Sequence, residues 1–225
     1  MVHPFLVFEW LANQIHINLG PHVIFGWLIA ILLIVLAWRA TRNLTESAPS
    51  GLQNFMEVVI EGLEKFIEEN AGPKGKEYFP LFATLALFIL SCNLIALVPG
   101  CYPPTANVNT NLAMALTVFG ATHYIGIKEH GFKYIKHFMG PVLPLAPLIF
   151  IIEVISHIAR PISLTLRLFG NMYGHEMVLM VFLALVPLFV PLPMMLMGIM
   201  VAFIQTFVFT LLSIIYISGA IEEAH

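Results

Sequence analysis

The sequence predicts an all-α polytopic membrane protein: five transmembrane helices, one amphipathic surface helix, and a long tilted hairpin formed by the last two spans. Hydrophobic residues make up 59% of the 225 residues and charged residues only 10%, whereas a soluble domain carries roughly 25% charged residues. Several apolar runs reach the length of about 20 residues that a spanning helix needs. No internal repeat is visible, and we expect one membrane domain over residues 1–225.

The apolar runs place the five spans at residues 22–38, 78–98, 109–127, 142–186 and 194–221. The fourth run is longer than a perpendicular helix requires, so we expect it to tilt, and Pro187 and Pro191 make the turn that follows. Residues 52–69 differ, because apolar side chains recur there every three or four positions among Glu and Lys. That pattern is typical of an amphipathic helix lying along the membrane surface, and Gly72 and Pro73 are expected to end it.

The distribution of cations predicts the orientation. Eight of the ten Lys and Arg lie in residues 39–76 and 128–136, and none lies in residues 1–21, 99–108 or 187–193. Because cytoplasmic loops are enriched in Lys and Arg, we expect the basic loops and the C-terminus in the cytoplasm and the N-terminus outside. No basic stripe or nucleic-acid motif is present, which argues against nucleic-acid binding.

Four isolated charges mark the long apolar region between residues 138 and 220, namely Glu153, Arg160, Arg167 and Glu176. A charge in the bilayer core costs a few kcal/mol, so each is a functional-site hypothesis. The seven-residue spacing of the first three predicts one charged face, on which Arg160 pairs with Glu153. Arg167 has no nearby acid, because Glu176 lies on the opposite face about 13 Å further along the helix.

Two further polar groups accompany these charges. His175 adjoins Glu176 without the HExxH spacing of a zinc protease, so we interpret the pair as a proton relay. Gln205 is the strong polar group of the last span, and the hairpin should bring it within about a turn of Arg167 or Glu176; simple helix-to-helix hydrogen bonding is the alternative. We expect no metal, no cofactor and no catalytic residue.

The run SLTLRLFGNMYGHE at residues 163–176 resembles the signature of subunit a of bacterial F-type ATP synthases. The segment that begins at Thr105, the run QTFVF that begins at Gln205 and the EEAH tail resemble the same family. The likeness covers the chain from about residue 20 to its end. It implies a multi-pass protein of the bacterial inner (cytoplasmic) membrane.

The resemblance also implies a function and partners. The chain would be the proton-conducting stator subunit of the membrane sector, not itself an enzyme. Its partners would be the rotating ring of small subunits (the c-ring), subunit b of the peripheral stalk, membrane lipid and the transported proton, with Na⁺ not excluded. Arg167 would be the stator arginine facing the ring carboxylates. The other positions carried over to the ion pathway are His175, Glu176, Asn171, Gln205, Glu153 and Ser163.

The sequence departs from the best-known bacterial pattern at three positions. That pattern has Gly at the position of His175 and His at the position of Gly198, so the two changes resemble a swap that keeps one imidazole beside the acid. Asn107 stands where many relatives have Asp. Two other readings stay open: a stand-alone ion channel or secondary transporter, for which the broken-helix pair is missing, and an intramembrane hydrolase, for which the residue spacing does not fit.

Overall fold

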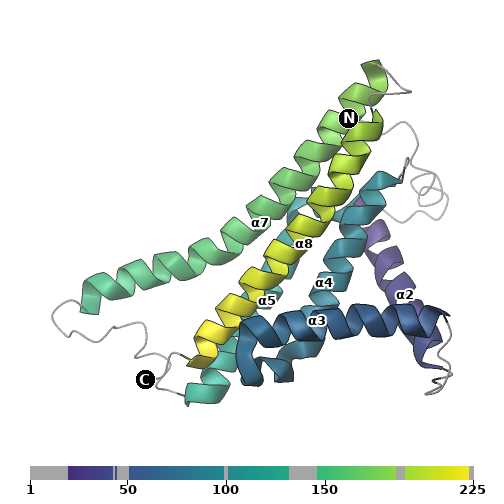
Figure 1. Ribbon diagram of the computed structural model, residues 1–225. Helices are drawn as coiled ribbons and strands as arrows, with labels where there is room; N and C mark the ends of the chain where they lie inside the picture. Colours follow the sequence, from purple (N-terminus) through teal and green to yellow (C-terminus); the bar gives the residue numbers. More distant parts are fainter. Residues whose placement is uncertain are drawn as a thin grey trace.

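The computed structural model describes residues 20–42, 44, 51–98, 101–131, 146–185 and 191–222, and its regular elements there are all helical (Figure 1). This confirms the predicted all-α class. The α-helices are α2 (Pro21–Thr41), α3 (Gly51–Gly75), α4 (Phe79–Leu94), α5 (Val108–His130), α7 (Ala146–Leu185) and α8 (Pro191–Glu222). Three short 3-10 helices join them: η1 (Lys76–Tyr78), η2 (Ile95–Leu97) and η3 (Pro104–Ala106). The predicted domain extent at residues 1–19 and 223–225 lies outside the described residues.

Four helical segments are long and apolar enough to cross a membrane: Pro21–Thr41, Lys76–Leu97, Pro147–Leu185 and Leu192–Ile221. They match four of the five expected spans within a few residues. The fifth, α5, is 23 residues long but carries Asn109, Asn111 and His123 among its apolar residues, so it falls short of that criterion. The count of five spans therefore stays a prediction, while the multi-pass, all-helical architecture stands.

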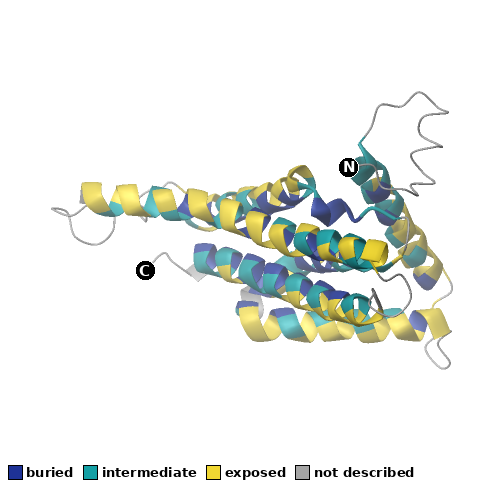
Figure 2. Cartoon of the chain, turned by 90° about the horizontal axis from the view of Figure 1, so that it is seen from above, coloured by how far each residue is buried: buried dark blue, intermediate teal, exposed yellow. Residues whose placement is uncertain are grey.

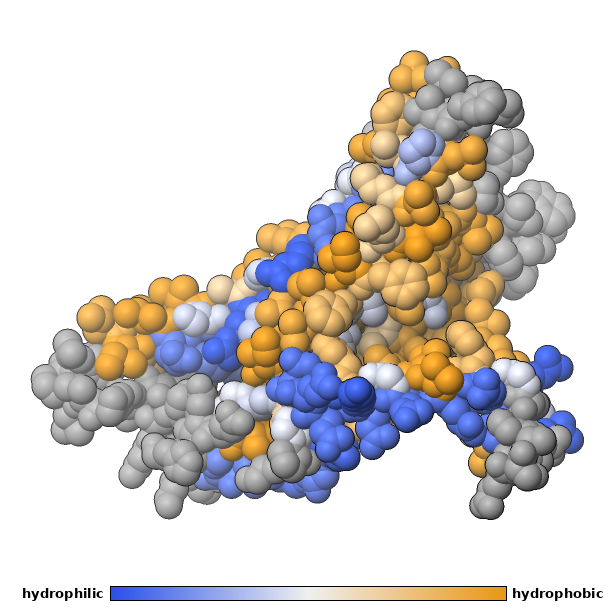
Figure 3. Space-filling model, in the orientation of Figure 1, coloured by the Kyte–Doolittle hydropathy of each residue, from blue (hydrophilic) through white to orange (hydrophobic). Residues whose placement is uncertain are grey.

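Helix α3 lies across one end of the bundle (Figure 1), and hydrophilic residues cover its outer surface (Figure 3). Its buried residues Ile67 and Ala71 pack with residues of α4, α5 and α8. The predicted break occurs at Gly72, whose φ of 65° lies in the left-handed region that favours glycine. One more turn then leads to Lys76, whose Nζ lies 2.9 Å from Oε2 of Glu68.

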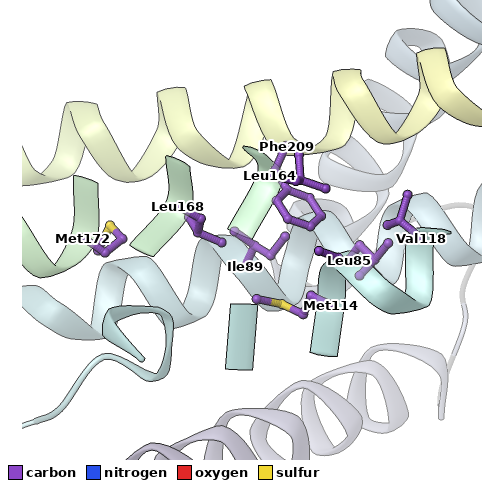
Figure 4. Close-up of a cluster of buried hydrophobic side chains, with 9 residues drawn as sticks. Leu85, Ile89, Met114, Val118, Leu164, Leu168, Met172 and Phe209 are labelled. Atoms are coloured by element: carbon purple, nitrogen blue, oxygen red, sulfur yellow. The ribbon is translucent and has the colours of Figure 1, made fainter. Parts of the chain in front are cut away.

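The core lies where α4, α5, α7 and α8 meet. Its members are Leu85, Ile89, Met114, Ala115, Val118, Leu164, Leu168, Met172 and Phe209 (Figure 4). The hairpin of α7 and α8 is close at the turn and opens toward the other end, where α5 packs against both helices. The opposite side of α7 is largely exposed along its length (Figure 2). This exposed side and the α7–α8 contact hold most of the predicted site residues.

Candidate functional site

The outward face of α7 carries a stripe of polar and small residues. Ser163, Arg167 and Asn171 follow one another at four-residue spacing, and all three are exposed, so they lie one above the other on the helix. The positions one residue further, Leu164, Leu168 and Met172, are 1–2% exposed and belong to the core. Burial of that apolar row fixes the rotation of α7, and the polar row must then face outward. We call Ser163, Arg167, Gly170 and Asn171 the outward stripe.

Arg167 makes no ion pair and no side-chain hydrogen bond with the part of the chain that the structure describes. Within the described residues, the two glycines that follow it do not pack against a neighbouring helix, because a Cβ added at Gly170 or Gly174 would meet nothing within 4 Å. A hydrophilic band accordingly interrupts the apolar surface along α7 (Figure 3). The expected isolation of Arg167 is confirmed within the described chain, and the surface beside it is open to another molecule.

Arg160 does not have the partner that the sequence predicts. The predicted pair with Glu153 is not formed; the guanidinium lies 5.1 Å from the ring centroid of Tyr216 on α8, a cation–π arrangement. Glu153 instead faces His157, whose Nδ1 lies 3.2 Å from the carboxylate Oε1 and 3.0 Å from the Glu153 carbonyl oxygen. The seven-residue spacing suggested that Glu153 and Arg160 could pair. It could not show that the His157 ring, four residues after Glu153, lies beside the carboxylate in place of Arg160.

His175 is held against the neighbouring helix. The side chain is 7% exposed, and its Nε2 donates a hydrogen bond of 2.9 Å to the carbonyl oxygen of Met194 on α8. A Cβ added at Gly198 would lie 2.5 Å from Nε2 and 2.6 Å from Cε1 of the same ring. Since contacts this short do not occur, the imidazole occupies the space that a side chain at position 198 would need. The structure thus brings together the two positions of the predicted His/Gly swap.

Glu176, the next residue, is half-buried and lies near the loop that precedes α5. Burial, with a further contribution from the Glu176 carboxylate, raises the pKa of Tyr102 in that loop. At the end of the same loop Asn107 accepts a hydrogen bond of 2.9 Å from the Asn109 N–H and so caps α5. Its Nδ2 donates to Nδ1 of His22 at 3.3 Å. Polar groups from α2, the loop and α7 thus gather at one end of the bundle.

Gln205 lies half-buried on α8, and within the described residues its side chain makes no hydrogen bond with Arg167. The neighbouring turn of α8 contacts α4 instead: Nδ2 of the buried Asn93 donates to the Ala202 carbonyl and to Oγ1 of Thr206, both at 3.4 Å. Of the residues predicted for the site, the structure therefore gathers Ser163, Arg167 and Asn171 on one face. It places His175, Glu176 and Gln205 elsewhere on the hairpin.

Several polar residues near the hairpin were missed by the sequence reasoning. They are His22, Tyr102, His123 and Tyr216. The signal for His123 was available, because a histidine within an apolar span is unusual; the other three become relevant only through tertiary contacts. Among the described residues no group of three or more His, Cys, Asp or Glu side chains is arranged to hold a metal ion.

Comparison with known proteins gives a consistent result. The family model described as ATP synthase A chain matches residues 23–218. "ATP synthase subunit a 1" of Syntrophotalea carbinolica is 60% identical over 235 residues, covering 100% of both chains. "ATP synthase subunit a" of Trichlorobacter lovleyi is 59% identical and that of Geobacter sulfurreducens 58% identical, again over 100% of both chains.

Proposed function

The chain belongs to the ATP synthase subunit a family, and from that premise we propose how it works as the proton-translocating stator subunit of the membrane sector. The observation that carries the proposal is the outward stripe, in which an exposed Arg167 has no partner within the described chain. On this proposal the partner is a carboxylate on each subunit of a rotating c-ring, which passes along this face of α7.

The chemistry of arginine fits this role. A guanidinium does not lose its proton in a protein, so Arg167 presents a permanent cation to the ring. A carboxylate facing Arg167 is favoured in its ionised form, while one that moves away into lipid loses its partner and becomes protonated. The same cation repels a proton that would otherwise pass directly between two aqueous half-channels. Each transferred charge can release about 2.3 kcal/mol per 100 mV of membrane potential, and the ring must turn for the transfer to finish.

Gly170 and Asn171 help the ring approach. An added Cβ at Gly170 meets nothing within 4 Å, so a neighbouring helix can come near the backbone of α7 beside Arg167, as small residues allow in membranes. Asn171 and Ser163 flank the arginine one turn away on each side. They supply polar groups that exchange hydrogen bonds with a passing carboxylate without adding charge.

Two half-channels would meet the ring on either side of Arg167. Toward the turn between α7 and α8, Glu176 and His175 would receive protons from outside, with Gln205 as a neighbouring polar group. Toward the opposite end, Glu153 would exchange protons with the cytoplasm. The placement of Lys and Arg in residues 39–76 and 128–136 supports this orientation. The transported ion would be the proton, in the inner membrane of a bacterium, with subunit b holding the chain against rotation.

Arg167→Ala in inverted membrane vesicles tests the proposal. We expect ATP-driven proton pumping to fall to background while the complex stays assembled, because the ring carboxylates lose the cation that discharges them. Arg160→Ala is the comparison variant: the same residue type is removed seven positions away on the same helix, and pumping should fall clearly less than in Arg167→Ala. Undiminished pumping by an assembled Arg167→Ala complex would contradict the proposal, and a stand-alone channel would conduct without any ring.

A further inference from the structure

Two histidines and one carboxylate form a second polar cluster, away from Arg167. His123 on α5 and His157 on α7 have ring centroids 5.4 Å apart in an edge-on arrangement, and Nδ1 of His157 lies 3.2 Å from Oε1 of Glu153. His157 is buried and His123 half-buried. We call Glu153, His157 and His123 the histidine cluster. Ionisable side chains so deep in a membrane protein are a functional-site hypothesis by default.

The hydrogen bonds assign the tautomer of each ring. Nδ1 of His123 lies 3.1 Å from the Phe119 carbonyl oxygen, and Nδ1 of His157 lies 3.0 Å from the Glu153 carbonyl oxygen. A carbonyl oxygen only accepts, so in the neutral rings Nδ1 carries the hydrogen and Nε2 is the base. Each imidazole can therefore take a proton at Nε2 and release another from Nδ1.

A small cavity adjoins both rings. It measures about 10 Å³ and is lined by His123, His157, Arg160, Pro161 and Tyr216, among others, which is about the smallest space that holds a water molecule. Pro161 has no N–H, so the usual helical donor to the His157 carbonyl oxygen is missing at this turn. Both rings border this small space, so a proton that leaves one ring can reach the other across it.

The charges around the cluster disfavour a proton that stays on either imidazole. Arg160 lines the same cavity and is held over Tyr216 of α8. Its permanent charge repels a second cation on a neighbouring imidazole. A proton that arrives on His157 is therefore not held there, and the Glu153 carboxylate, whose Oε1 lies 3.2 Å from Nδ1, is the group within reach that can take it. Among the described residues, the titratable and charged groups near His157 include His123, Arg160, Tyr216 and Glu153.

The cluster lies near one end of the bundle. His123 is seven residues from His130, where α5 ends, and Nε2 of His130 is 3.0 Å from the carbonyl oxygen of Ile221 at the end of α8. At 1.5 Å per residue the cluster is about 10 Å from that end, and His157 is about 15 Å from Arg167 along α7. The orientation proposed above makes this the cytoplasmic end.

We propose that the histidine cluster is a proton relay between the ring-facing surface and the cytoplasm, with the two imidazoles acting in series. In the exit direction a proton binds Nε2 of one ring, crosses the cavity to Nε2 of the other, and the Nδ1 proton of His157 moves to Oε1 of Glu153. Glu153 then releases one proton to cytoplasmic water, so that one proton enters the cluster and one leaves it. The His157 ring is left with its hydrogen on Nε2 and must reorient before the next transfer. This inference rests on the proposed stator function.

Glutamine substitutions test the relay, because glutamine keeps a hydrogen-bond donor of similar size but does not titrate. Vesicles from which the catalytic sector has been stripped would be made with His123→Gln, His157→Gln and the double variant. We expect passive proton conduction to fall by about tenfold in each, below the hundredfold typical of an acid–base group because water also reaches Glu153. Conduction should also lose part of its dependence on cytoplasmic-side pH, because glutamine has no group that titrates.

The design separates a relay from packing. Two groups in series give a double variant no slower than the slower single variant, a clear departure from additivity. His130→Gln removes a histidine outside the cluster and should leave the pH profile unchanged. A pH profile that survives in both cluster variants, or that changes equally in His130→Gln, would overturn the relay. Arg167→Ala assayed in parallel keeps the two proposals apart: if it alone abolishes coupled pumping, the relay fails and the stator function stands.

Discussion

Helix α7 meets α8 in two different ways at its two ends. Near the turn the helices touch directly, and the His175 ring occupies the space beside Gly198. Toward the other end α5 packs against both helices, and Arg160 reaches across a small cavity to Tyr216. Close contact fixes one imidazole through backbone geometry, whereas the open end holds a small cavity between several titratable groups. We expect substitutions at the first contact to damage assembly, and substitutions of His123 and His157 at the second to alter proton transfer.

The strongest test of the close contact is Gly198→Leu. A leucine needs the space of the His175 ring, whose Nε2 would be 2.5 Å from the first added carbon, and overpacking of this kind costs about 1–3 kcal/mol or more. We expect much less assembled complex in the membrane, measured by the amount of subunit retained after detergent purification. Gly120→Leu is the control, because an added Cβ there meets nothing within 4 Å; equal losses in both would contradict the packing argument.

Exchanging His175 and Gly198 between the two helices tests the same contact. His175→Gly removes the imidazole and Gly198→His introduces a clash, so each single variant should lose most ATP-driven pumping. The combination of both substitutions returns one imidazole to the same space from the other helix. We expect it to pump better than either single variant. A double variant as poor as the worse single one would show that the ring is needed on α7 itself.

Glu176→Gln tests whether the titratable group near this contact takes part in proton entry. The amide is nearly isosteric with the carboxyl group but cannot carry a proton, so assembly should be unaffected. We expect the rate of ATP synthesis at a fixed membrane potential to fall by about tenfold or more. An unchanged rate would remove Glu176 from the pathway.

At the open end, Tyr216→Leu should have a smaller effect. It removes the ring under Arg160, an interaction worth about 0.5–2 kcal/mol, and leaves the cation on α7. Tyr216→Phe keeps the aromatic face and serves as the control. We expect the leucine variant to lower the thermal denaturation temperature of the purified complex by a few degrees while pumping persists. Loss of pumping in both variants would point instead to the tyrosine hydroxyl.

The smallest effect is expected at Asn107, away from both contacts. Asn107→Ala removes the cap of α5 and the hydrogen bond to His22, at a cost of about 1 kcal/mol. Asn107→Asp keeps the cap and removes only the amide donor to His22. We expect a larger drop in denaturation temperature for the alanine variant than for the aspartate variant, and equal drops would speak against the capping role.

The sequence was a good guide where one local property decides the outcome. Hydropathy located four helices that are long and apolar enough to cross a membrane, and Gly72 marked the break in α3. The seven-residue spacing of the α7 charges was less informative, because seven residues fall about 20° short of two full turns. That shift, and the packing of Leu164 and Leu168, leave Arg160 half-buried and Arg167 exposed.

Partners from other helices could not be predicted from spacing along one helix. The neighbours of His157 and Arg160 are His123 and Tyr216, which are distant in sequence and became evident only when α5 and α8 were in place. Gly198 is an instructive exception: the paired departure from the family pattern pointed to contact with His175, and the structure places the two in contact. The transport roles assigned to the site residues remain predictions for the experiments above.

The bare guanidinium on the outward stripe also has a consequence for biosynthesis. A newly inserted copy without its partner exposes this cation to lipid, where a charged side chain at mid-membrane costs about 2.5–3.5 kcal/mol on insertion scales. An orphan subunit would therefore be less stable than one docked on a carboxylate-bearing neighbour. We expect its cellular half-life to depend on co-expression of that neighbour, so that the residue needed for turnover of the motor also limits how many unassembled stators persist.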